Sequence, residues 1–203
     1  MAAPPKLMGV ILAGGRSTRM GGGDKGLLPL GGKPVIAHVI ARLHPQLPDL
    51  IINANGDPAR FQPFGLPVVG DRIPGFKGPL AGLHATMRYA AGKGASHVVT
   101  TAADTPFLPP DLVSRLVTAA EVADIVLAAS GGNVHPVAGL WPVALEADLA
   151  AFLNSGEKPG MRAWASRYRV AEADFPDNAN AFFNINTPQD LARAAELLAK
   201  LKS

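Results

Sequence analysis

The stretch Leu7-Met8-Gly9-Val10-Ile11-Leu12-Ala13-Gly14-Gly15 decides the fold, and it opens a glycine-rich loop that runs from Leu12 to Gly26. Its apolar part, Leu7–Leu12, has the length and composition of a buried strand. The glycines of the loop let backbone N–H groups approach a phosphate without a Cβ in the way. The same loop carries three cations, Arg16, Arg19 and Lys25. A strand followed by such a loop predicts a binding site for a nucleoside triphosphate.

Two common phosphate-binding motifs do not match this loop. A P-loop requires Gly-Lys followed by Ser or Thr, whereas this chain has Asp24-Lys25-Gly26. The dinucleotide-binding fingerprint lacks the basic residues found here. A flexible surface loop without a ligand stays open as the alternative.

The rest of the chain alternates short apolar runs with segments of helical spacing. Strands are predicted at Leu7–Leu12, Leu50–Asn53, Leu66–Val69, His97–Thr101, Ile125–Ala129 and Pro136–Trp141. Helices are predicted at Pro34–Leu43, Gly78–Tyr89, Pro109–Ala120, Ala144–Leu153 and from Thr187 onward. The last helix has the clearest start, with Thr187 as N-cap, Pro188 at the first position and Asp190 as the acid of a capping box.

This alternation predicts an α/β fold, a Rossmann-like three-layer α/β/α arrangement around a mainly parallel sheet. The length of 203 residues fits one domain, residues 1–203. Ligands of such sheets bind at the carboxyl ends of the strands. The loops after Leu12, Asn53, Val69 and Ala102 should therefore converge on one cleft.

Composition narrows the classes of partner and compartment. The chain has no cysteine, which excludes disulfides and thiolate metal sites and favours a reducing, cytoplasmic setting. The first segment, Met1–Leu12, does not have the pattern of a signal peptide, and no apolar run is long enough to span a membrane. A net charge of +3 suits anionic small molecules and does not require nucleic acid as a partner.

A carboxylate follows the predicted strand His97–Thr101. Asp104, in Thr101-Ala102-Ala103-Asp104-Thr105-Pro106-Phe107, is placed to hold Mg²⁺, which takes one or two carboxylates and fills its octahedron with phosphate oxygens and water. The alternative is an aspartate that only caps a helix or builds a turn. Asp71 occupies a similar place after Val69 and is less distinctive.

Several amide side chains also stand beside predicted strands or turns. Asn53 and Asn55 could read the edge of a base, because an amide both donates and accepts. The segment Gly78–Leu83 could hold a purine against its backbone, or be a plain turn into a helix. Asn184 and Asn186 share one face of an extended segment and could bind an acceptor, or only build the turn into the last helix. The five histidines show no metal-ligand spacing, and only His135, next to Pro136, merits attention.

Together these motifs resemble the MobA-type molybdenum cofactor guanylyltransferases, from Gly9 to about Ala195. The residues that carry the resemblance are Leu12-Ala13-Gly14-Gly15, Arg19-Met20-Gly21-Gly22, Asp24-Lys25-Gly26, Asn53-Ala54-Asn55, Gly78-Pro79-Leu80-Ala81-Gly82, Asp104-Thr105-Pro106 and Asn184-Ile185-Asn186-Thr187-Pro188. The resemblance implies a nucleotide-diphospho-sugar transferase-like fold whose N-terminal part binds GTP and whose C-terminal part binds the acceptor. The later motifs favour GTP over CTP.

The resemblance also implies a role for each site residue. Leu12, Ala13 and Gly14 would contact GTP, with Gly15 and Arg19 beside its phosphates and Lys25 paired with them. Asn53 and Asp71 would bind the nucleoside, Asp104 would hold Mg²⁺, and Asn184 and Asn186 would bind molybdenum-molybdopterin. Arg19, Lys25 and Asp104 would then be the catalytic groups.

The implied reaction transfers GMP from GTP to the terminal phosphate of molybdenum-molybdopterin and releases pyrophosphate. A basic residue of the acceptor side could be Arg162, Lys158 or Arg167. Proteins that deliver the cofactor or mature molybdoenzymes are expected as transient partners. The rival functions are a nucleotidyltransferase that uses CTP or a sugar or polyol phosphate, and a nucleotide-binding module without catalysis.

Overall fold

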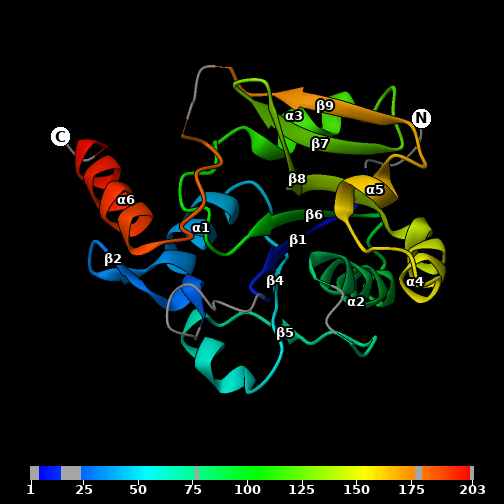
Figure 1. The fold of residues 1–203 in the computed structure, drawn as a ribbon, viewed down its shortest axis with the longest axis horizontal. Helices are drawn as coiled ribbons and strands as arrows, with labels where there is room; N and C mark the ends of the chain where they lie inside the picture. The colour runs from blue at the N-terminus through cyan, green and yellow to red at the C-terminus, as the bar shows by residue number, and fades with distance from the viewer. Residues whose placement is uncertain (1–4, 15–23, 76–77, 177–179, 202–203) are drawn as a thin grey trace.

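The computed structural model describes residues 5–14, 24–75, 78–176 and 180–201. In those residues one sheet contains seven strands: β1 (Leu7–Leu12), β4 (Leu50–Asn53), β5 (Val68–Val69), β6 (His97–Ala102), β7 (Ile125–Ser130), β8 (Asn133–Pro142) and β9 (Val170–Asp174). Their order across the sheet is β5-β4-β1-β6-β8-β7-β9, with β1 and β6 near the middle (Figure 1).

Strand β8 is the antiparallel member of this sheet. It pairs antiparallel with both β6 and β7, whereas the other neighbouring strands pair parallel. A two-residue turn, Gly131-Gly132, joins β7 to β8, and its φ angles of +55° and +75° suit the tight hairpin turn that such a reversal needs. The predicted mainly parallel sheet is confirmed, and the reversal at β8 adds to it.

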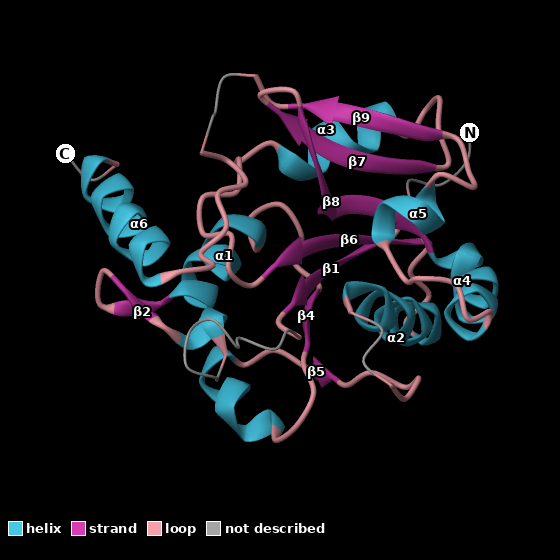
Figure 2. Cartoon of the chain, in the orientation of Figure 1, coloured by secondary structure: helices cyan, strands magenta, loops and turns pink. Residues whose placement is uncertain are grey.

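Helices cover both faces of the sheet, as the alternation of elements predicts (Figure 2). One face packs against α1 (Val35–Leu43) and α3 (Leu112–Ala119), which bury Val39 and Leu116 against it. The other face packs against α2 (Pro79–Gly92), α4 (Glu146–Asn154) and α5 (Met161–Ala165), with Met87 and Trp164 in that core. The three-layer prediction is confirmed. No helix in the described ranges is long and apolar enough to cross a membrane.

The last helix, α6 (Pro188–Lys200), lies at one side of the sheet beside a small hairpin (Figure 1). That hairpin consists of β2 (Pro29–Leu30) and β3 (Lys33–Pro34), and Leu30 packs with Ile185 and Ala194 in a separate apolar cluster. The predicted capping box of Thr187 and Asp190 is present. This contact brings the segment that precedes α6 back to the middle of the sheet.

Short 3-10 turns complete the element list: η2 (Lys25–Leu27), η3 (Pro58–Phe64) and η4 (Val143–Leu145). Several elements had no counterpart in the sequence prediction, namely β2, β3, η3, α5 and β9. The strand β9 has a single bulky apolar residue, Val170, and α5 is five residues long. Neither gives a periodic pattern long enough to recognise.

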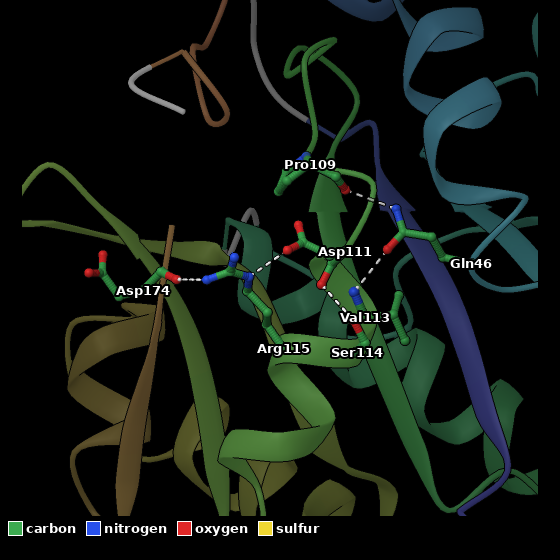
Figure 3. Close-up of polar contacts among 7 residues, drawn as sticks. All are labelled: Gln46, Pro109, Asp111, Val113, Ser114, Arg115 and Asp174. Atoms are coloured by element: carbon green, nitrogen blue, oxygen red, sulfur yellow. Dashed lines mark hydrogen bonds and ion pairs between the residues drawn. The ribbon is translucent and has the colours of Figure 1, made fainter. Parts of the chain in front are cut away.

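The loop from β6 to α3 is hydrogen-bonded to Gln46, which follows α1 on the same face of the sheet (Figure 3). Gln46 Nε2 donates to the Pro109 carbonyl at 2.9 Å, and Gln46 Oε1 accepts from the Val113 amide at 2.9 Å. The helix α3 begins at Leu112, not at Pro109 as predicted, and Asp111 makes no side-chain cap. Gln46 supplies the missing cap from another part of the chain, and it steadies the loop that follows β6.

Candidate active site

The ends of β1 and β6 lie side by side and carry the two loops singled out from the sequence. The strands pair in register up to Leu12 and Ala102, and the Ala103 amide donates to the Leu12 carbonyl at 3.0 Å. A cavity of about 200 Å³ opens at this edge. We call it the central cavity, and its lining includes Leu12, Ala13, Gly14, Lys25, Asp104 and Asn184.

Lys25 and Asp104 face each other in the central cavity. The distance from Lys25 Nζ to Asp104 Oδ2 is 3.8 Å. Gly26 permits this approach, because a Cβ there would lie 3.0 Å from the Ala103 Cβ. Burial raises the pKa of the Asp104 carboxyl above its ordinary value, and the Lys25 ammonium only partly opposes that rise. The cavity therefore holds a carboxylate with too little positive charge around it and a lysine directed at the same space.

The C-terminal asparagines reach the same two residues. Asn186 Oδ1 accepts from Lys25 Nζ at 2.5 Å, and Asn184 Oδ1 accepts from Thr105 Oγ1 at 2.6 Å. Between them, the Ile185 amide donates to the Asp104 carbonyl at 3.0 Å. The backbone N–H of Asn186 also donates to the Asp190 side chain at the start of α6. The segment thus builds the start of α6 and also places Asn184 in the lining of the central cavity.

Asn53 and Asp71 meet beside the central cavity without lining it. Asn53 Nδ2 donates to the Val69 carbonyl and to Asp71 Oδ1, both at 3.0 Å, and Asn53 is buried. Asn55 Nδ2 donates to Asp71 Oδ2 at 2.7 Å, and the Asp71 amide donates to Asn55 Oδ1 at 2.8 Å. The Asn53 donors are therefore already used within the chain. Asp71 is more exposed than Asn53, and two amide side chains hold it in place.

Gly82 explains part of the predicted Gly78–Leu83 motif. A Cβ on Gly82 would lie 2.1 Å from Asn53 Oδ1, so a side chain there would displace Asn53. Pro79, in the first turn of α2, lines the central cavity. The motif therefore supplies both a wall of the cavity and room for the Asn53 side chain.

Arg60 joins two of these loops, and sequence reasoning missed it. Its guanidinium donates to the Asp24 carboxylate, to the Asn55 carbonyl and to the Asp57 carbonyl. Asp24 precedes Lys25, and Asn55 holds Asp71, so Arg60 connects the end of the glycine-rich loop to the Asn53–Asp71 group. The Arg60 charge also neutralises a carboxylate that would otherwise stand beside Lys25.

Replacing Arg60 with alanine should raise the KM for a bound nucleoside triphosphate by about 10-fold, because charge-assisted hydrogen bonds that order both loops are lost. Arg60→Lys should recover little of this, since an ammonium cannot reproduce the forked geometry. Arg169→Ala, which breaks an exposed ion pair with Asp124, is the matched control. Steady-state kinetics checks this, and an unchanged KM in Arg60→Ala would remove the residue from the site.

The other residues singled out from the sequence are the remaining members of the glycine-rich loop and three basic residues of the C-terminal half. Gly15, Arg16 and Arg19 fall outside the described residues. Arg162 lines a separate cavity of about 380 Å³ beside Tyr168 and Glu172, and Arg167 Nη2 lies 3.5 Å from Asp148 Oδ1. Lys158 is exposed. None of these three basic residues lines the central cavity.

Comparison with known proteins identifies the family. A family model described as the MobA-like NTP transferase domain matches residues 9–172. The chain belongs to this family. A molybdenum cofactor guanylyltransferase from Cereibacter sphaeroides is 54% identical over 195 residues, covering 96% of this chain and 98% of that relative. One from Bradyrhizobium sp. (strain ORS 278) is 50% identical over 196 residues, covering 94% and 92%.

A solved structure of the same kind supports the fold of this MobA-like transferase. The structure of molybdopterin-guanine dinucleotide biosynthesis protein A from Archaeoglobus fulgidus matches with a TM-score of 0.75 at 23% identity. The match covers 96% of this chain and 99% of that one. The nucleotide-diphospho-sugar transferase-like fold expected from the motifs is confirmed, and so is the family resemblance.

Proposed function

We propose that this chain transfers GMP from GTP to the terminal phosphate of molybdenum-molybdopterin, which forms molybdopterin guanine dinucleotide and releases pyrophosphate. Relatives named molybdenum cofactor guanylyltransferase match almost the whole chain and support this reaction. The structural observation that carries it is the pair Lys25 and Asp104, which face each other in one cavity at the ends of adjoining strands.

The positions of the other site residues indicate on which side of the sheet each substrate would bind. Asp71 and its amide partners lie at the β4 and β5 side, where the nucleoside of GTP would bind. Asn184 lies at the β6 side, where the acceptor would bind. The phosphates of the two substrates would then meet between them, next to Lys25 and Asp104. The chain acts here as one domain, residues 1–203, with the donor bound mainly by its N-terminal part.

The chemistry needs positioning and charge neutralisation more than proton transfer. An oxygen of the acceptor phosphate forms a bond to the α-phosphorus of GTP. The bond from that phosphorus to the bridging oxygen breaks, and its electron pair leaves with pyrophosphate. The nucleophile is already an anion near neutral pH, so no general base is required. Lys25 stabilises charge on the phosphates, and the cavity holds both substrates in line.

A divalent metal fits the carboxylate of Asp104, and we assign Mg²⁺ to it. Among the described residues, no group of three or more His, Cys, Asp or Glu side chains gathers to hold a metal ion. Mg²⁺ does not need such a group, because it accepts one carboxylate and completes its shell with phosphate oxygens and water. When bound, the ion neutralises charge on the triphosphate. Asp104 would therefore hold the metal together with GTP, not alone.

A pyrophosphate-release assay with each of four nucleoside triphosphates tests this function when it is run with molybdopterin, with a sugar or polyol phosphate, and without an acceptor. We expect release with GTP and only when the acceptor is present. Equal release with CTP would favour the cytidylyl alternative, and release with a sugar or polyol phosphate as acceptor would favour that one. Binding of GTP without release under any condition would indicate a non-catalytic module.

Asn184→Ala should raise the KM for the acceptor about 10-fold and leave the affinity for GTP unchanged, because one hydrogen bond to the acceptor is lost. Initial rates at saturating GTP and separate calorimetric titration with Mg²⁺-GTP measure the two effects. A loss of GTP affinity instead would place Asn184 on the donor side.

We place the reaction in the cytoplasm, where GTP is available. We also propose transient contacts with proteins that deliver molybdopterin and with those that mature molybdoenzymes.

A further inference from the structure

A second cavity lies next to the central cavity, and an irregularity in β8 creates it. On β7, Leu127 pairs with Gly139 of β8, but the next residue, Ala128, pairs with His135. Residues 136–138 of β8 therefore have no partner on β7 and form a bulge. On the other side, pairing of β8 with β6 ends at Thr100, so Thr101 and Ala102 have no partner on β8. Because of this shift in register, β8 separates from β6 and β7 at this point. β-Bulges are common beside binding sites.

Buried contacts hold the bulge in one position. Thr100 Oγ1 donates to the Val137 carbonyl at 2.7 Å and accepts from Trp141 Nε1 at 2.8 Å. Thr100 and Trp141 are fully buried. The opening beside the bulge is thus fixed by the core of the protein and is not a consequence of a loose surface loop.

The opening is a cavity of about 230 Å³, which we call the bulge cavity. It shares Ala102, Val137 and Asn184 with the central cavity, so the two are adjacent. A ligand whose phosphate lies near Asp104 can therefore extend its other end into the bulge cavity. The Asn53–Asp71 group lies across β1 from it, on the β4 and β5 side of the sheet.

The lining of the bulge cavity suits an uncharged ring and not a phosphate. Among the described residues it contains no Lys, Arg, Asp or Glu. Its aromatic wall is the stacked pair His135 and Phe182, with ring centroids 4.6 Å apart. His135 Nε2 lies 2.9 Å from Ser130 Oγ, and its other ring nitrogen has no hydrogen-bond partner within the described part of the chain. Burial lowers the pKa of His135 below its ordinary value, which favours the neutral imidazole.

We propose that the bulge cavity receives the uncharged ring system of the acceptor, with the free ring nitrogen of His135 as its hydrogen-bonding contact, while the acceptor's phosphate reaches Lys25 and Asp104. This inference rests on the proposed function, which supplies an acceptor with a hydrogen-bonding heterocycle and a terminal phosphate. The two substrates then occupy opposite sides of β1 and β6, with guanine near Asp71 and the acceptor's ring near His135.

The test measures acceptor and donor binding separately. His135→Ala should raise the acceptor KM about 10-fold at saturating GTP, which corresponds to the loss of one buried hydrogen bond. His135→Gln should recover part of the loss, because an amide also hydrogen-bonds. Ala138→Leu, which narrows the bulge cavity at a residue that lines neither the central cavity nor the cavity beside Arg162, should raise the acceptor KM as well. The calorimetric Kd for Mg²⁺-GTP should stay within about twofold in all three, since no donor contact is removed.

His97→Ala is the matched control, because His97 is also partly buried but lies at the opposite end of β6. Thermal unfolding shows whether each variant is folded. Direct binding of molybdopterin, followed by its fluorescence, gives a readout that does not depend on turnover. If molybdopterin binding weakens in His135→Ala while the wild type makes no dinucleotide, the proposed function fails and the assigned cavity stands.

Two results would overturn the assignment. An acceptor KM and molybdopterin affinity unchanged in both His135→Ala and Ala138→Leu would exclude the bulge cavity as the ring site. A loss of GTP affinity with no change for the acceptor would make it the guanine site instead.

Discussion

Asp104→Ala is expected to lower kcat/KM by at least about 1000-fold, because the variant loses the carboxylate that holds the metal against the triphosphate. The fold should persist, since the Asp104 side chain contributes an ion pair with Lys25 and no apolar packing. Initial rates of pyrophosphate release over a range of Mg²⁺ concentrations measure the effect. A variant that turns over normally at ordinary Mg²⁺ concentrations would contradict the assignment of the metal to Asp104.

The same residue should limit the stability of the free protein. Because burial raises the pKa of Asp104 in the folded state, the folded protein binds more protons there than the unfolded chain does. The contribution of Asp104 to the free energy of unfolding therefore falls as the pH rises from the ordinary carboxyl pKa through the raised pKa. Asp104→Asn should melt at a higher temperature than the wild type at pH 7, and the gap should close in acid below the ordinary pKa. A higher melting temperature in Asp104→Asn would show that a loss of activity in this variant is not caused by unfolding.

Lys25→Ala is expected to reduce kcat/KM for GTP by about 100-fold, because one positive charge that meets the phosphates is removed from the central cavity. The KM for GTP should rise and kcat should fall together, since the charge acts on both the bound triphosphate and the leaving pyrophosphate. Lys25→Arg should keep part of the activity, limited by the fit of the larger group beside Gly26. Stopped-flow binding of GTP and steady-state rates distinguish the two effects.

Lys33→Ala provides the control for this variant, because Lys33 is an exposed lysine of the β2–β3 hairpin. Its kinetics should equal those of the wild type. Should Lys25→Ala behave in the same way, Lys25 would have no part in the site and the pairing with Asp104 would be only structural.

The convergence of Lys25 and Asp104 was predictable from sequence. Each follows an apolar run that has the length of a strand, and parallel strands present their carboxyl ends at one edge. The bounds of Leu7–Leu12 and Leu50–Asn53 match the structure, as does the capped start of α6. Local pattern was sufficient wherever an apolar run or a cap determined the element.

Features that depend on distant partners could not be predicted in this way. Arg60 lies in a 3-10 segment with two prolines and no apolar period, and its partner Asp24 is 36 residues away. The start of α3 depends on Gln46 from a different connection. The bulge cavity depends on a shift of register between β7 and β8, and this shift leaves no mark on the residue pattern of β8. Each arises from pairing between segments, and a single sequence does not record pairing.

The most direct test follows two labels of GTP through one reaction with the purified chain, Mg²⁺ and molybdopterin. With GTP labelled at the α-phosphate, the account predicts that the label appears in molybdopterin guanine dinucleotide, in equal amount to the acceptor consumed. With GTP labelled at the γ-phosphate, the label should appear only in pyrophosphate. Label released from the γ-position as inorganic phosphate, with no α-label in the dinucleotide, would contradict nucleotidyl transfer at the Lys25–Asp104 cavity.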